Sequence, residues 1–459
     1  MEICIGKSIR KVLMAVTVMA VLLNTFVMPS LVEAYGPSTM FKPSTGVPAP
    51  GALYARAMQA SNGKMYATFE QYTTGVSVFP IYESANNGQS WTKVGDVKDT
   101  HKGVGMRWEP QLYELPQPIG NMPAGTLLCA GLVLPYDRSF CEIDLYKSND
   151  SGRNWSFVST IAVGKVATPG NDPVWEPFLL VDNNKLICYY SDERDSAYSQ
   201  KLVHQTTTDG INWGSVVNDV AISNQRPGMV EVAKMPNGNY IMTYEIVGTG
   251  GAYYKISSNP ESWNAKDAGT CFDSKGSSPY CVVMNGTVIL SSAGNNNLYT
   301  NTNNGTGGWT QISCVIGSCY SRCLVPLSNG RLFVIGAGWN GSGLNSVTYG
   351  DMAGPVGPAT STPTKVTNTP TPTKVTNTPT PTKVTIAPTS TPTPTVSTGD
   401  LNKDGVINMA DVILLANVFN STRGDSKFVD GYDLNRDGVI NMADVIFIAG
   451  KFNTTVKNI

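Results

Sequence analysis

The fold of this 459-residue chain is decided by a recurring stretch, whose clearest copy is Ser148-Asn-Asp150-Ser-Gly152-Arg-Asn-Trp155. Looser copies occupy residues 84–91, 207–213, 258–263 and 302–309, and each of them ends in tryptophan. Serine, asparagine, aspartate and glycine favour tight turns, because their side chains bond to the local backbone or leave it free to reverse direction. We therefore expect each copy to form a turn between two strands.

Six pairs of apolar segments alternate with these turns. Within a pair, a short turn, often Asn-Gly as at Asn237-Gly238, joins the two segments, which is typical of a β-hairpin. The second segments begin near Lys64, Thr126, Lys185, Asn239, Thr287 and Arg331. Hairpin chemistry alone explains any single turn, but five turns interleaved with six hairpins, at a period of about 45–60 residues, indicate a repeat architecture. The sequence predicts an all-β, six-bladed β-propeller over residues 35–355.

Composition argues against several classes of function. Charged residues make up 15% of the chain and the formal net charge is −1, so we expect no nucleic-acid partner. The only two histidines, His101 and His204, argue against a three-histidine zinc site. The nine cysteines show no spacing typical of a metal site. We expect no cofactor for catalysis.

Residues 1–34 have the pattern of a secretory signal peptide. Lys7, Arg10 and Lys11 precede an apolar run over residues 12–27, and Val32-Glu33-Ala34 provides small residues for cleavage. An uncleaved membrane anchor is the alternative, but the apolar run is short for a span. No later apolar run is long enough to cross a bilayer. We therefore expect a secreted, extracellular protein without a membrane partner.

Residues 356–398 are expected to separate two modules. The segment consists almost entirely of Thr, Pro, Val, Lys and Ser, and the unit Lys365-Val-Thr-Asn-Thr-Pro-Thr-Pro-Thr recurs from Lys374. Proline-rich segments are extended and cannot bury a core. The segment is therefore interpreted as a spacer between the propeller and a C-terminal module over residues 399–459.

The C-terminal module carries two loops with the ligand spacing of a calcium site. Each loop has oxygen-bearing side chains at positions 1, 3, 5, 9 and 12, a glycine at position 6, and a backbone carbonyl at position 7. The predicted ligands are Asp400, Asn402, Asp404, the Val406 carbonyl, Asn408 and Asp411, followed by Asp433, Asn435, Asp437, the Val439 carbonyl, Asn441 and Asp444. A helix candidate follows each loop, over residues 412–419 and 445–452. The sequence predicts two bound Ca²⁺ ions in a small α-helical module.

This duplicated loop–helix unit resembles the type I dockerin family. The resemblance implies a module that anchors an enzyme to a cohesin domain of a cellulosome scaffold protein. Family members often have Ser-Thr just before the twelfth ligand, where this chain has Met409-Ala410 and Met442-Ala443. The resemblance implies a cohesin partner and leaves open which cohesin it is.

The predicted blade topology gathers polar side chains at one end of the propeller. First strands begin and second strands end on the same face, whereas the tryptophan-containing turns fall on the opposite face. The side chains expected there are Arg56, Glu109, Glu176, Arg226, Tyr280 and Arg322 from first strands, and Glu70, Asp192, Glu193 and Glu245 from second strands. A solvated rim accounts for some of them, but Glu109 and Glu176 each follow a tryptophan and precede a proline. Paired carboxylates with flanking aromatic residues favour glycoside hydrolysis.

The large module resembles glycoside hydrolase family 93, and its tryptophan-containing turns resemble the Asp-box of sialidase-like propellers. The family motifs are Asn171-Asp-Pro-Val-Trp-Glu176-Pro-Phe, Tyr190-Ser-Asp192-Glu193-Arg194 and Tyr240-Ile-Met-Thr-Tyr-Glu245. The resemblance implies a retaining exo-α-1,5-L-arabinanase that releases arabinobiose from plant cell-wall arabinan, with Glu176 as acid/base and Glu245 as nucleophile. The candidate substrate-binding residues are Arg56, Trp108, Glu109, Trp175, Asp192, Arg226, Tyr320 and Arg322.

Two other functions stay open at this point. A sialidase would bind a substrate carboxylate with Arg56, Arg226 and Arg322, and would use Tyr320 or Tyr280 as nucleophile. Against it, the Phe-Arg-Ile-Pro sequence of sialidases is absent, and Leu53-Tyr-Ala-Arg56 stands at the corresponding place. A noncatalytic sugar-binding propeller is the other alternative.

Overall fold

The chain divides into two units, which are described separately. The computed structural model describes residues 34–355 apart from 249 and 339–342, and residues 399–451 apart from 404, 405, 408, 426 and 450. The predicted signal peptide (except its last residue) and the predicted spacer lie outside the described residues. The predicted ligands Asp404 and Asn408 also lie outside them.

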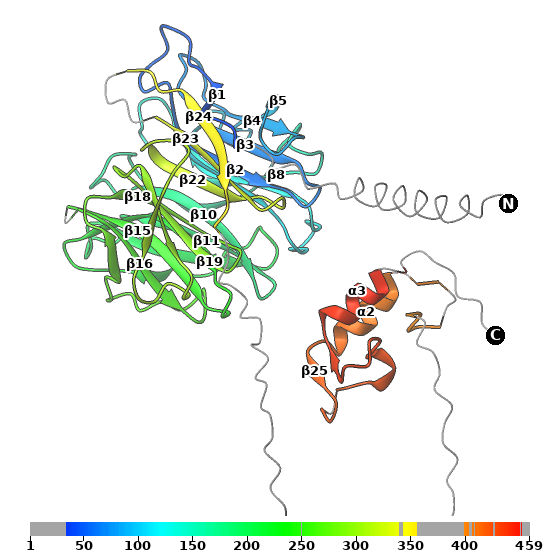
Figure 1. The fold of residues 1–459 in the computed structure, drawn as a ribbon. Coiled ribbons are helices and arrows are strands. Elements are labelled where there is room, and N and C mark those ends of the chain that lie inside the picture. Colours follow the sequence, from blue (N-terminus) through cyan, green and yellow to red (C-terminus); the bar gives the residue numbers. More distant parts are fainter. Residues whose placement is uncertain are drawn as a thin grey trace, which may run out of the picture. The chain divides into compact units, whose positions relative to one another are not determined.

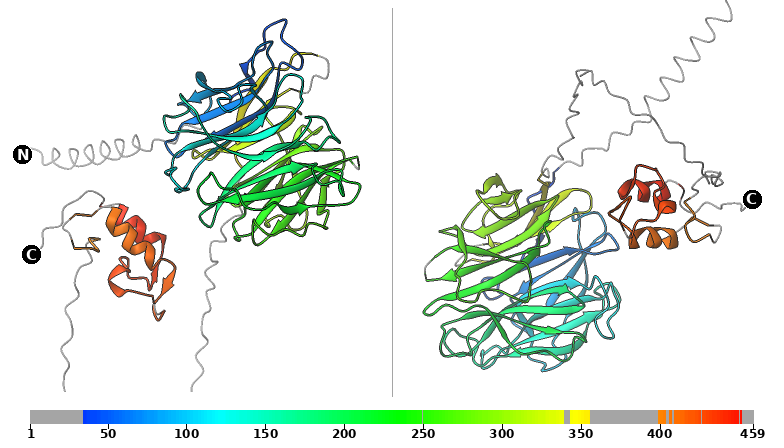
Figure 2. Two further views of the ribbon diagram at one scale, coloured as in Figure 1. Left: turned by 180° about the vertical axis from the view of Figure 1, so that it is seen from behind. Right: turned by 90° about the horizontal axis from the view of Figure 1, so that it is seen from below.

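The described part of the large unit is a ring of six four-stranded antiparallel sheets, which confirms the predicted six-bladed propeller (Figure 1; Figure 2). Blades 1 to 5 are each built from four consecutive strands. The first strands contact one another around the ring, so they lie innermost. Blade 6 has the order β22-β23-β24-β1, so the N-terminal strand closes the ring by pairing with β24.

The strands have the following bounds. Blades 1 and 2 consist of β2 (Ala52–Gln59), β3 (Met65–Gln71), β4 (Phe79–Ser84), β5 (Thr92–Val97), β6 (Met106–Glu114), β7 (Leu127–Val133), β8 (Glu142–Ser148) and β9 (Ser156–Val163). Blades 3 and 4 consist of β10 (Val174–Asp182), β11 (Lys185–Asp192), β12 (Lys201–Thr207), β13 (Val217–Val220), β14 (Arg226–Lys234), β15 (Tyr240–Val247), β16 (Ala252–Ser257) and β17 (Thr270–Asp273). Blades 5 and 6 consist of β18 (Ser277–Met284), β19 (Thr287–Ala293), β20 (Asn297–Asn301), β21 (Thr310–Ser313), β22 (Tyr320–Pro326), β23 (Arg331–Ala337), β24 (Val347–Ala353) and β1 (Ser38–Phe41). Each second strand begins within one residue of its predicted start.

Every innermost strand carries a bulge near its start. The pairing register shifts at equivalent places in all six blades, for example between Trp175 and Phe178 in β10. One residue in each bulge has a positive φ of 47–61°, namely Tyr54, Glu109, Glu176, Met229, Ser278 and Ser321. Non-glycine residues rarely adopt this conformation, and a bulge turns a local backbone group out of the ladder. The bulges therefore change the direction of one backbone N–H per blade.

The tryptophan-containing turns join the third and fourth strands of blades 1 to 5, as predicted. In the clearest copy, the Ser148 hydroxyl oxygen accepts a hydrogen bond from the Gly152 N–H at 3.0 Å, and the Asp150 carboxylate accepts one from the Asn154 N–H at 2.9 Å. The Trp155 indole N–H donates to the Gly152 carbonyl at 3.0 Å. These turns lie on the face opposite to the starts of the first strands.

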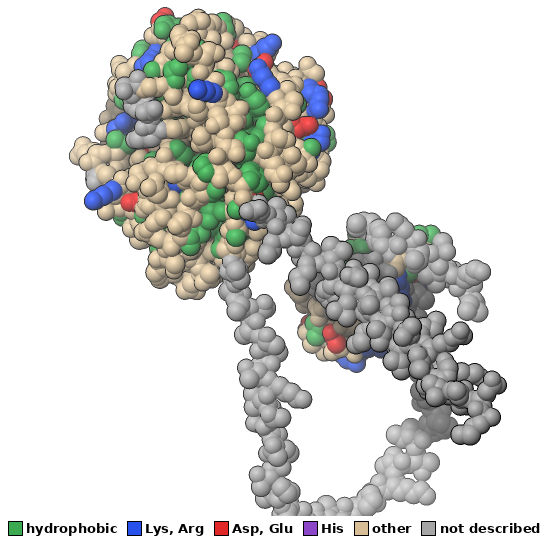
Figure 3. All heavy atoms as spheres, turned by 45° about the horizontal axis from the view of Figure 1, so that its top comes forward, with side chains coloured by type: hydrophobic (Ala, Val, Ile, Leu, Met, Phe, Trp, Pro, Cys, Tyr) green, Lys and Arg blue, Asp and Glu red, His purple; other side chains and the backbone are tan. Residues whose placement is uncertain are grey.

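The hydrophobic core lies between neighbouring sheets. Phe79 and Ile81 of blade 1, for example, pack with Leu112 and Cys129 of blade 2. All eight cysteines among the described residues are free thiols. Charged side chains are scattered over the face of the propeller seen in Figure 3, in keeping with their low share of the sequence.

The C-terminal unit contains helices α2 (Met409–Asn417) and α3 (Met442–Ala449), the short helix η1 (Asp430–Tyr432), and the paired strands β25 (Ser421–Thr422) and β26 (Val439–Ile440). Both helices begin three residues before their predicted starts, because the last loop residues already form the first helical turn. Ile407, Leu415, Leu434, Ile440 and Ile448 form its small core. None of the helices in the described residues is long and apolar enough to cross a bilayer.

Candidate active site

Four carboxylates in consecutive blades each accept a hydrogen bond from the bulge N–H of the next blade. The pairs are Glu70 with the Glu109 N–H (2.9 Å), Glu109 with the Glu176 N–H (2.6 Å), Glu176 with the Met229 N–H (2.6 Å), and Glu245 with the Ser278 N–H (2.7 Å). The repeated bulge thus holds four acidic groups on one face of the propeller. This is the face on which the sequence predicted the polar funnel.

Glu176 lies near the start of the third blade, and one oxygen of its carboxylate is held by hydrogen bonds. Its Oε2 accepts hydrogen bonds from the Met229 N–H and from the Ser191 hydroxyl, at 2.6 and 2.7 Å. Burial and the negative charge of Glu245 together raise the pKa of Glu176 to about 7, although the two hydrogen bonds act to lower it. A raised pKa favours the protonated form near neutral pH, which is the form that a general acid requires.

Glu245 lies near the end of the second strand of the fourth blade, and its partners offset part of the effect of burial on its pKa. Burial raises its pKa, whereas the Ser278 N–H and the positive charge of Arg226 lower it. Arg226 is itself held by Glu193 and Gln200, at 2.5 and 2.6 Å. The two carboxyl groups are therefore in unequal environments. Such a difference allows one carboxyl group to stay protonated while the other is ionised.

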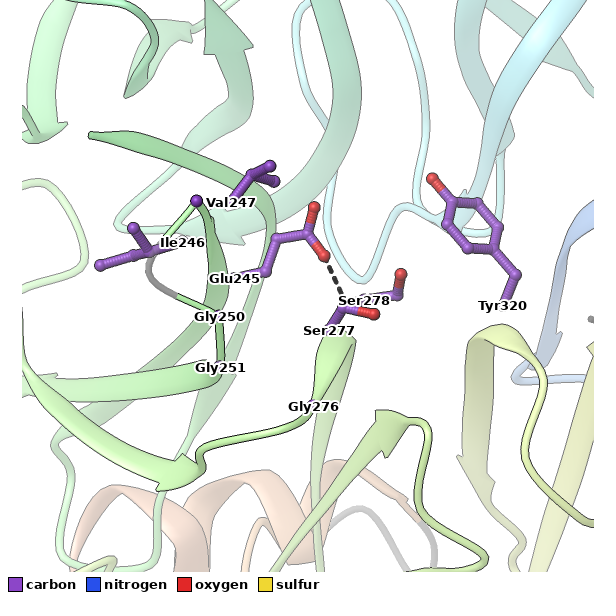
Figure 4. Close-up of a pocket in the computed structure, with 10 residues that line it drawn as sticks. Glu245, Ile246, Val247, Gly250, Gly251, Gly276, Ser277, Ser278 and Tyr320 are labelled. Atoms are coloured by element: carbon purple, nitrogen blue, oxygen red, sulfur yellow. Dashed lines mark hydrogen bonds between the residues drawn. The ribbon is translucent and has the colours of Figure 1, made fainter. Parts of the chain in front are cut away.

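Glu245 lines a pocket of about 290 Å³ together with Ser277, Ser278, Tyr320 and a glycine-rich segment around Gly250. Figure 4 shows the Glu245 carboxylate and the Tyr320 hydroxyl on opposite sides of this pocket. Burial and the charges of Glu176, Glu245 and Glu109 raise the pKa of Tyr320 well above its usual value. Tyr320 therefore belongs to the same site as the acidic residues and is protonated there.

Two tryptophans form one wall of the site. The rings of Trp108 and Trp175 lie 6.1 Å apart between their centroids, and the Trp175 indole N–H donates to Glu193 at 3.0 Å. Each tryptophan directly precedes the bulge residue of its strand, Glu109 or Glu176. Both rings pack in a hydrophobic core cluster, and Trp175 is only 9% exposed, so this wall supports the neighbouring carboxylates from the apolar interior.

Arg56 lies below the funnel, in the interior of the ring. Its guanidinium bonds to Glu231 at 3.1 Å, to Gln111 at 3.3 Å and to the Ser321 hydroxyl at 2.8 Å, and the side chain is only 2% exposed. Burial raises the pKa of the Glu231 carboxyl, whereas the positive charge of Arg56 and its hydrogen bond lower it. These contacts support a role in joining the inner strands rather than in binding substrate.

Arg322 and Asp192 also have structural partners. The guanidinium of Arg322 is buried and donates to four backbone carbonyls, those of Asn295, Asn297, Ile316 and Gly317. Asp192 is buried and forms an ion pair with Arg194 at 2.8 Å. The structure therefore brings Glu176, Glu245, Glu109, Trp108, Trp175, Arg226 and Tyr320 together, and it leaves Arg56, Arg322 and Asp192 outside this group.

Several residues at the site had little sequence signal. Ser191 holds the Glu176 carboxylate, Gln200 holds Arg226, and Glu231 neutralises Arg56. Ser191 and Gln200 are ordinary polar residues within or beside a strand. Glu231 follows Met-Val in a strand of mostly apolar residues. A charged residue in such a strand is the only sequence feature that could have indicated its buried ion pair.

The C-terminal loops place carboxylates around small spaces. In the first loop, the wholly buried Asp411 accepts hydrogen bonds from the N–H groups of Leu401 and Asn402. In the second loop, Asp444 accepts equivalent bonds from Leu434 and Asn435. The repetition confirms that the two loops share one conformation in the described residues.

The donor set fits a hard cation. Asp433 and Asp444 are almost completely buried although they are acidic, and Asn435 and Asp437 lie on the same loop. Oxygen ligands of this kind suit Ca²⁺, and buried carboxylates without a cation would repel one another. Of the ligands predicted in the first loop, the structure describes Asp400, Asn402, Val406 and Asp411.

Comparisons with known proteins agree with this architecture. The family model for the dockerin type I domain matches residues 398–453. The arabinanase of Penicillium chrysogenum, solved with arabinobiose, is 41% identical, with a TM-score of 0.66, over 70% of this chain and 98% of its own. A GH93 α-L-arabinofuranosidase of Fusarium graminearum, also solved with arabinobiose, is 36% identical over the same shares, with a TM-score of 0.65. The chain belongs to glycoside hydrolase family 93. No curated protein sequence gave a significant match.

Membership of family 93 makes the propeller a glycoside hydrolase and confirms the predicted family and enzyme class. The family 93 propeller is joined to a type I dockerin, as the sequence also predicted. A sialidase of Streptococcus pneumoniae is 12% identical with a TM-score of 0.51 over 69% of this chain and 71% of its own, a likeness in fold alone. The buried contacts of Arg56 and Arg322 leave only Arg226 of the three arginines that a sialidase would need.

Proposed function

We propose that the chain is a secreted, retaining exo-α-1,5-L-arabinanase that releases arabinobiose from linear arabinan. Two relatives of the propeller, at 41% and 36% identity, were solved with arabinobiose bound. The observation that carries the proposal is the unequal pair of carboxyl groups, Glu176 and Glu245, on adjacent blades. Glu176 has its pKa raised to about 7, in part by the charge of Glu245.

The proposed reaction follows from the state of these two groups. Glu176 protonates the glycosidic oxygen as the bond to the leaving chain breaks, and the Glu245 carboxylate attacks the anomeric carbon to form a glycosyl-enzyme. Water then attacks that carbon while Glu176 accepts its proton, which regenerates both groups. Arg226 favours the ionised form of Glu245. Trp108 and Trp175 flank the sugar, and Glu109 accepts hydrogen bonds from its hydroxyls.

The dockerin is proposed to bind two Ca²⁺ ions and then a cohesin domain of an extracellular scaffold. Support comes from the family match and from the buried acidic groups Asp411, Asp433 and Asp444. The bound enzyme would act on plant cell-wall polysaccharide beside other enzymes of the same assembly. The sequence pattern of residues 1–34 supports export from the cell.

Product analysis tests the proposed activity. The purified chain is incubated with linear arabinan, and the products are followed by chromatography from the first minutes onward. We expect arabinobiose from the start, without a ladder of longer oligosaccharides, and no sugar release from a sialoside. Early release of long oligosaccharides would contradict exo action, and release of sialic acid would overturn the proposed substrate class.

A further inference from the structure

A second polar cluster lies on blade 2, away from the carboxylates of the funnel. It is formed by the loop over residues 98–105, between β5 and β6, and by the third strand, β8. The Asp99 carboxylate folds this loop by accepting hydrogen bonds from the N–H groups of His101, Lys102, Val104 and Gly105, at 2.7–3.1 Å. The loop is thereby held in a shape that places the His101 ring over β8.

Three side chains converge in this cluster. The Nδ1 atom of His101 lies 3.3 Å from an oxygen of Asp144 and 3.4 Å from Oε1 of Glu142. One potential ligand atom of each residue lies within 4.8 Å of the other two. Glu142 and Asp144 are two positions apart on β8, so they point to the same face of the strand. The His101 ring is stacked on Phe157, with 4.2 Å between the ring centroids, which fixes its orientation.

One oxygen in the cluster has no hydrogen-bond partner. Oε1 of Glu142 is buried and accepts no hydrogen bond from the described residues, although His101 Nδ1 lies 3.4 Å away. The whole Glu142 side chain is only 3% exposed and that of Asp144 is fully buried. The second oxygen of Asp144 accepts a hydrogen bond from the Thr160 hydroxyl at 2.6 Å. A buried carboxylate oxygen without a donor is costly unless a cation compensates it.

We propose that His101, Glu142 and Asp144 form a site for a divalent transition-metal ion, with Zn²⁺ as the representative ion. An imidazole nitrogen with two carboxylates is a donor set that suits Zn²⁺ better than Ca²⁺ or Mg²⁺. Tetrahedral ligands at about 2.0–2.1 Å from zinc lie about 3.3 Å from one another. The two distances from His101 Nδ1, 3.3 and 3.4 Å, match this separation. His101 is one-third exposed, so water supplies the fourth ligand.

Lys102 competes with the metal. Its ammonium lies 3.6 Å from the other oxygen of Glu142 and is 42% exposed, so it can move into solvent when a metal ion binds. The site has a structural consequence, because the same loop leads directly into β6, which carries Trp108 and Glu109. A bound ion would link the loop before this strand to β8 and would thereby restrict the motion of Trp108 and Glu109 at the active site.

Metal binding is measured on the full chain with Ca²⁺ in excess, so that the dockerin loops are occupied. Isothermal titration with Zn²⁺ and native mass spectrometry give the affinity and the number of ions, and the thermal transition of the propeller gives a second readout. We expect one saturable Zn²⁺ per chain and a higher transition temperature. Glu142→Gln should weaken binding at least about tenfold, since losing even an outer-shell partner costs that much. Lys102→Met should bind Zn²⁺ more tightly than the wild type.

Asp137→Asn is the matched control, because Asp137 is an exposed carboxylate on the same blade outside the cluster. It should bind Zn²⁺ like the wild type. Absence of saturable binding, or equal binding in Glu142→Gln, would overturn the site and leave a histidine–carboxylate ion pair. If Glu142→Gln does not fold, His101→Gln on the exposed loop replaces it, with the same interpretation of both outcomes.

Discussion

At the scale of single residues, the proposed mechanism depends on a difference in pKa between two buried glutamates. Glu176 and Glu245 are both removed from water, but Arg226 and the Ser278 N–H offset part of the effect at Glu245. Glu176 instead has Glu245 as a negative neighbour, and its pKa rises to about 7. The sequence motifs identified both residues, whereas the difference in their acidity depends on neighbours from three other strands.

The pH dependence of turnover tests this difference. Because the pKa of Glu176 is raised to about 7, its acid form is present below that pH and is lost as the pH rises through it. We expect kcat/KM on arabinan to fall with rising pH near 7. Glu176→Gln should lower turnover by about 10²- to 10⁴-fold on substrates with poor leaving groups and should remove this alkaline decline. An unchanged decline in the variant would assign the titration to another group.

At the scale of strands, the site is built by six equivalent bulges in the innermost strands. Hairpin starts, turns and the number of blades could be predicted, because each depends on local turn chemistry and strand periodicity. The bulges could not, because a register shift within a hairpin changes neither the turn residues nor the apolar pattern on which the prediction was based. Glu109 shows the consequence: its position before Pro110 was visible, but its hydrogen bond to the Glu176 N–H was not.

The same inner strands enclose the ion pair of Arg56 and Glu231, which joins β2 to β14. Arg56→Met should lower the free energy of unfolding by about 3–5 kcal/mol, because it leaves the Glu231 carboxyl buried without its partner. The double variant Arg56→Met/Glu231→Leu should recover much of this loss. Chemical or thermal unfolding of the propeller measures both effects. Near-normal stability of the single variant would show that the pair is not needed to hold the inner strands.

At the scale of the whole molecule, a glycoside hydrolase is joined to a dockerin. The prediction that residues 356–398 separate two modules depends on their composition, which is dominated by proline and threonine. The calcium-ligand pattern was equally clear, since every ligand lies within one short loop. Roles for Arg56 and Arg322 were harder to predict, because arginines that bind a substrate and arginines that join strands occupy similar sequence positions.

The division into modules predicts separable functions. Asp411→Ala combined with Asp444→Ala removes one buried carboxylate from each loop, so calcium-dependent folding of the dockerin should fail. Cohesin binding, measured by calorimetry or native gel electrophoresis, should be lost. Turnover on soluble arabinan should stay within about twofold of the wild type, because the proposed active-site residues all lie in the propeller. Cohesin binding that persists in EDTA would contradict the role of calcium.

Chemical rescue of Glu245→Ala tests the central claim, that Glu245 is the nucleophile of a retaining pair with Glu176, most directly. The variant is incubated with an activated α-L-arabinofuranosyl substrate with and without azide, and the product is analysed by proton NMR. We predict that turnover is almost abolished without azide and partly restored with it, and that the product is a glycosyl azide of inverted configuration. Azide would then occupy the space of the missing carboxylate and attack the anomeric carbon from that side. Near-normal turnover of the folded variant without azide, or an azide product of retained configuration, would contradict the assignment.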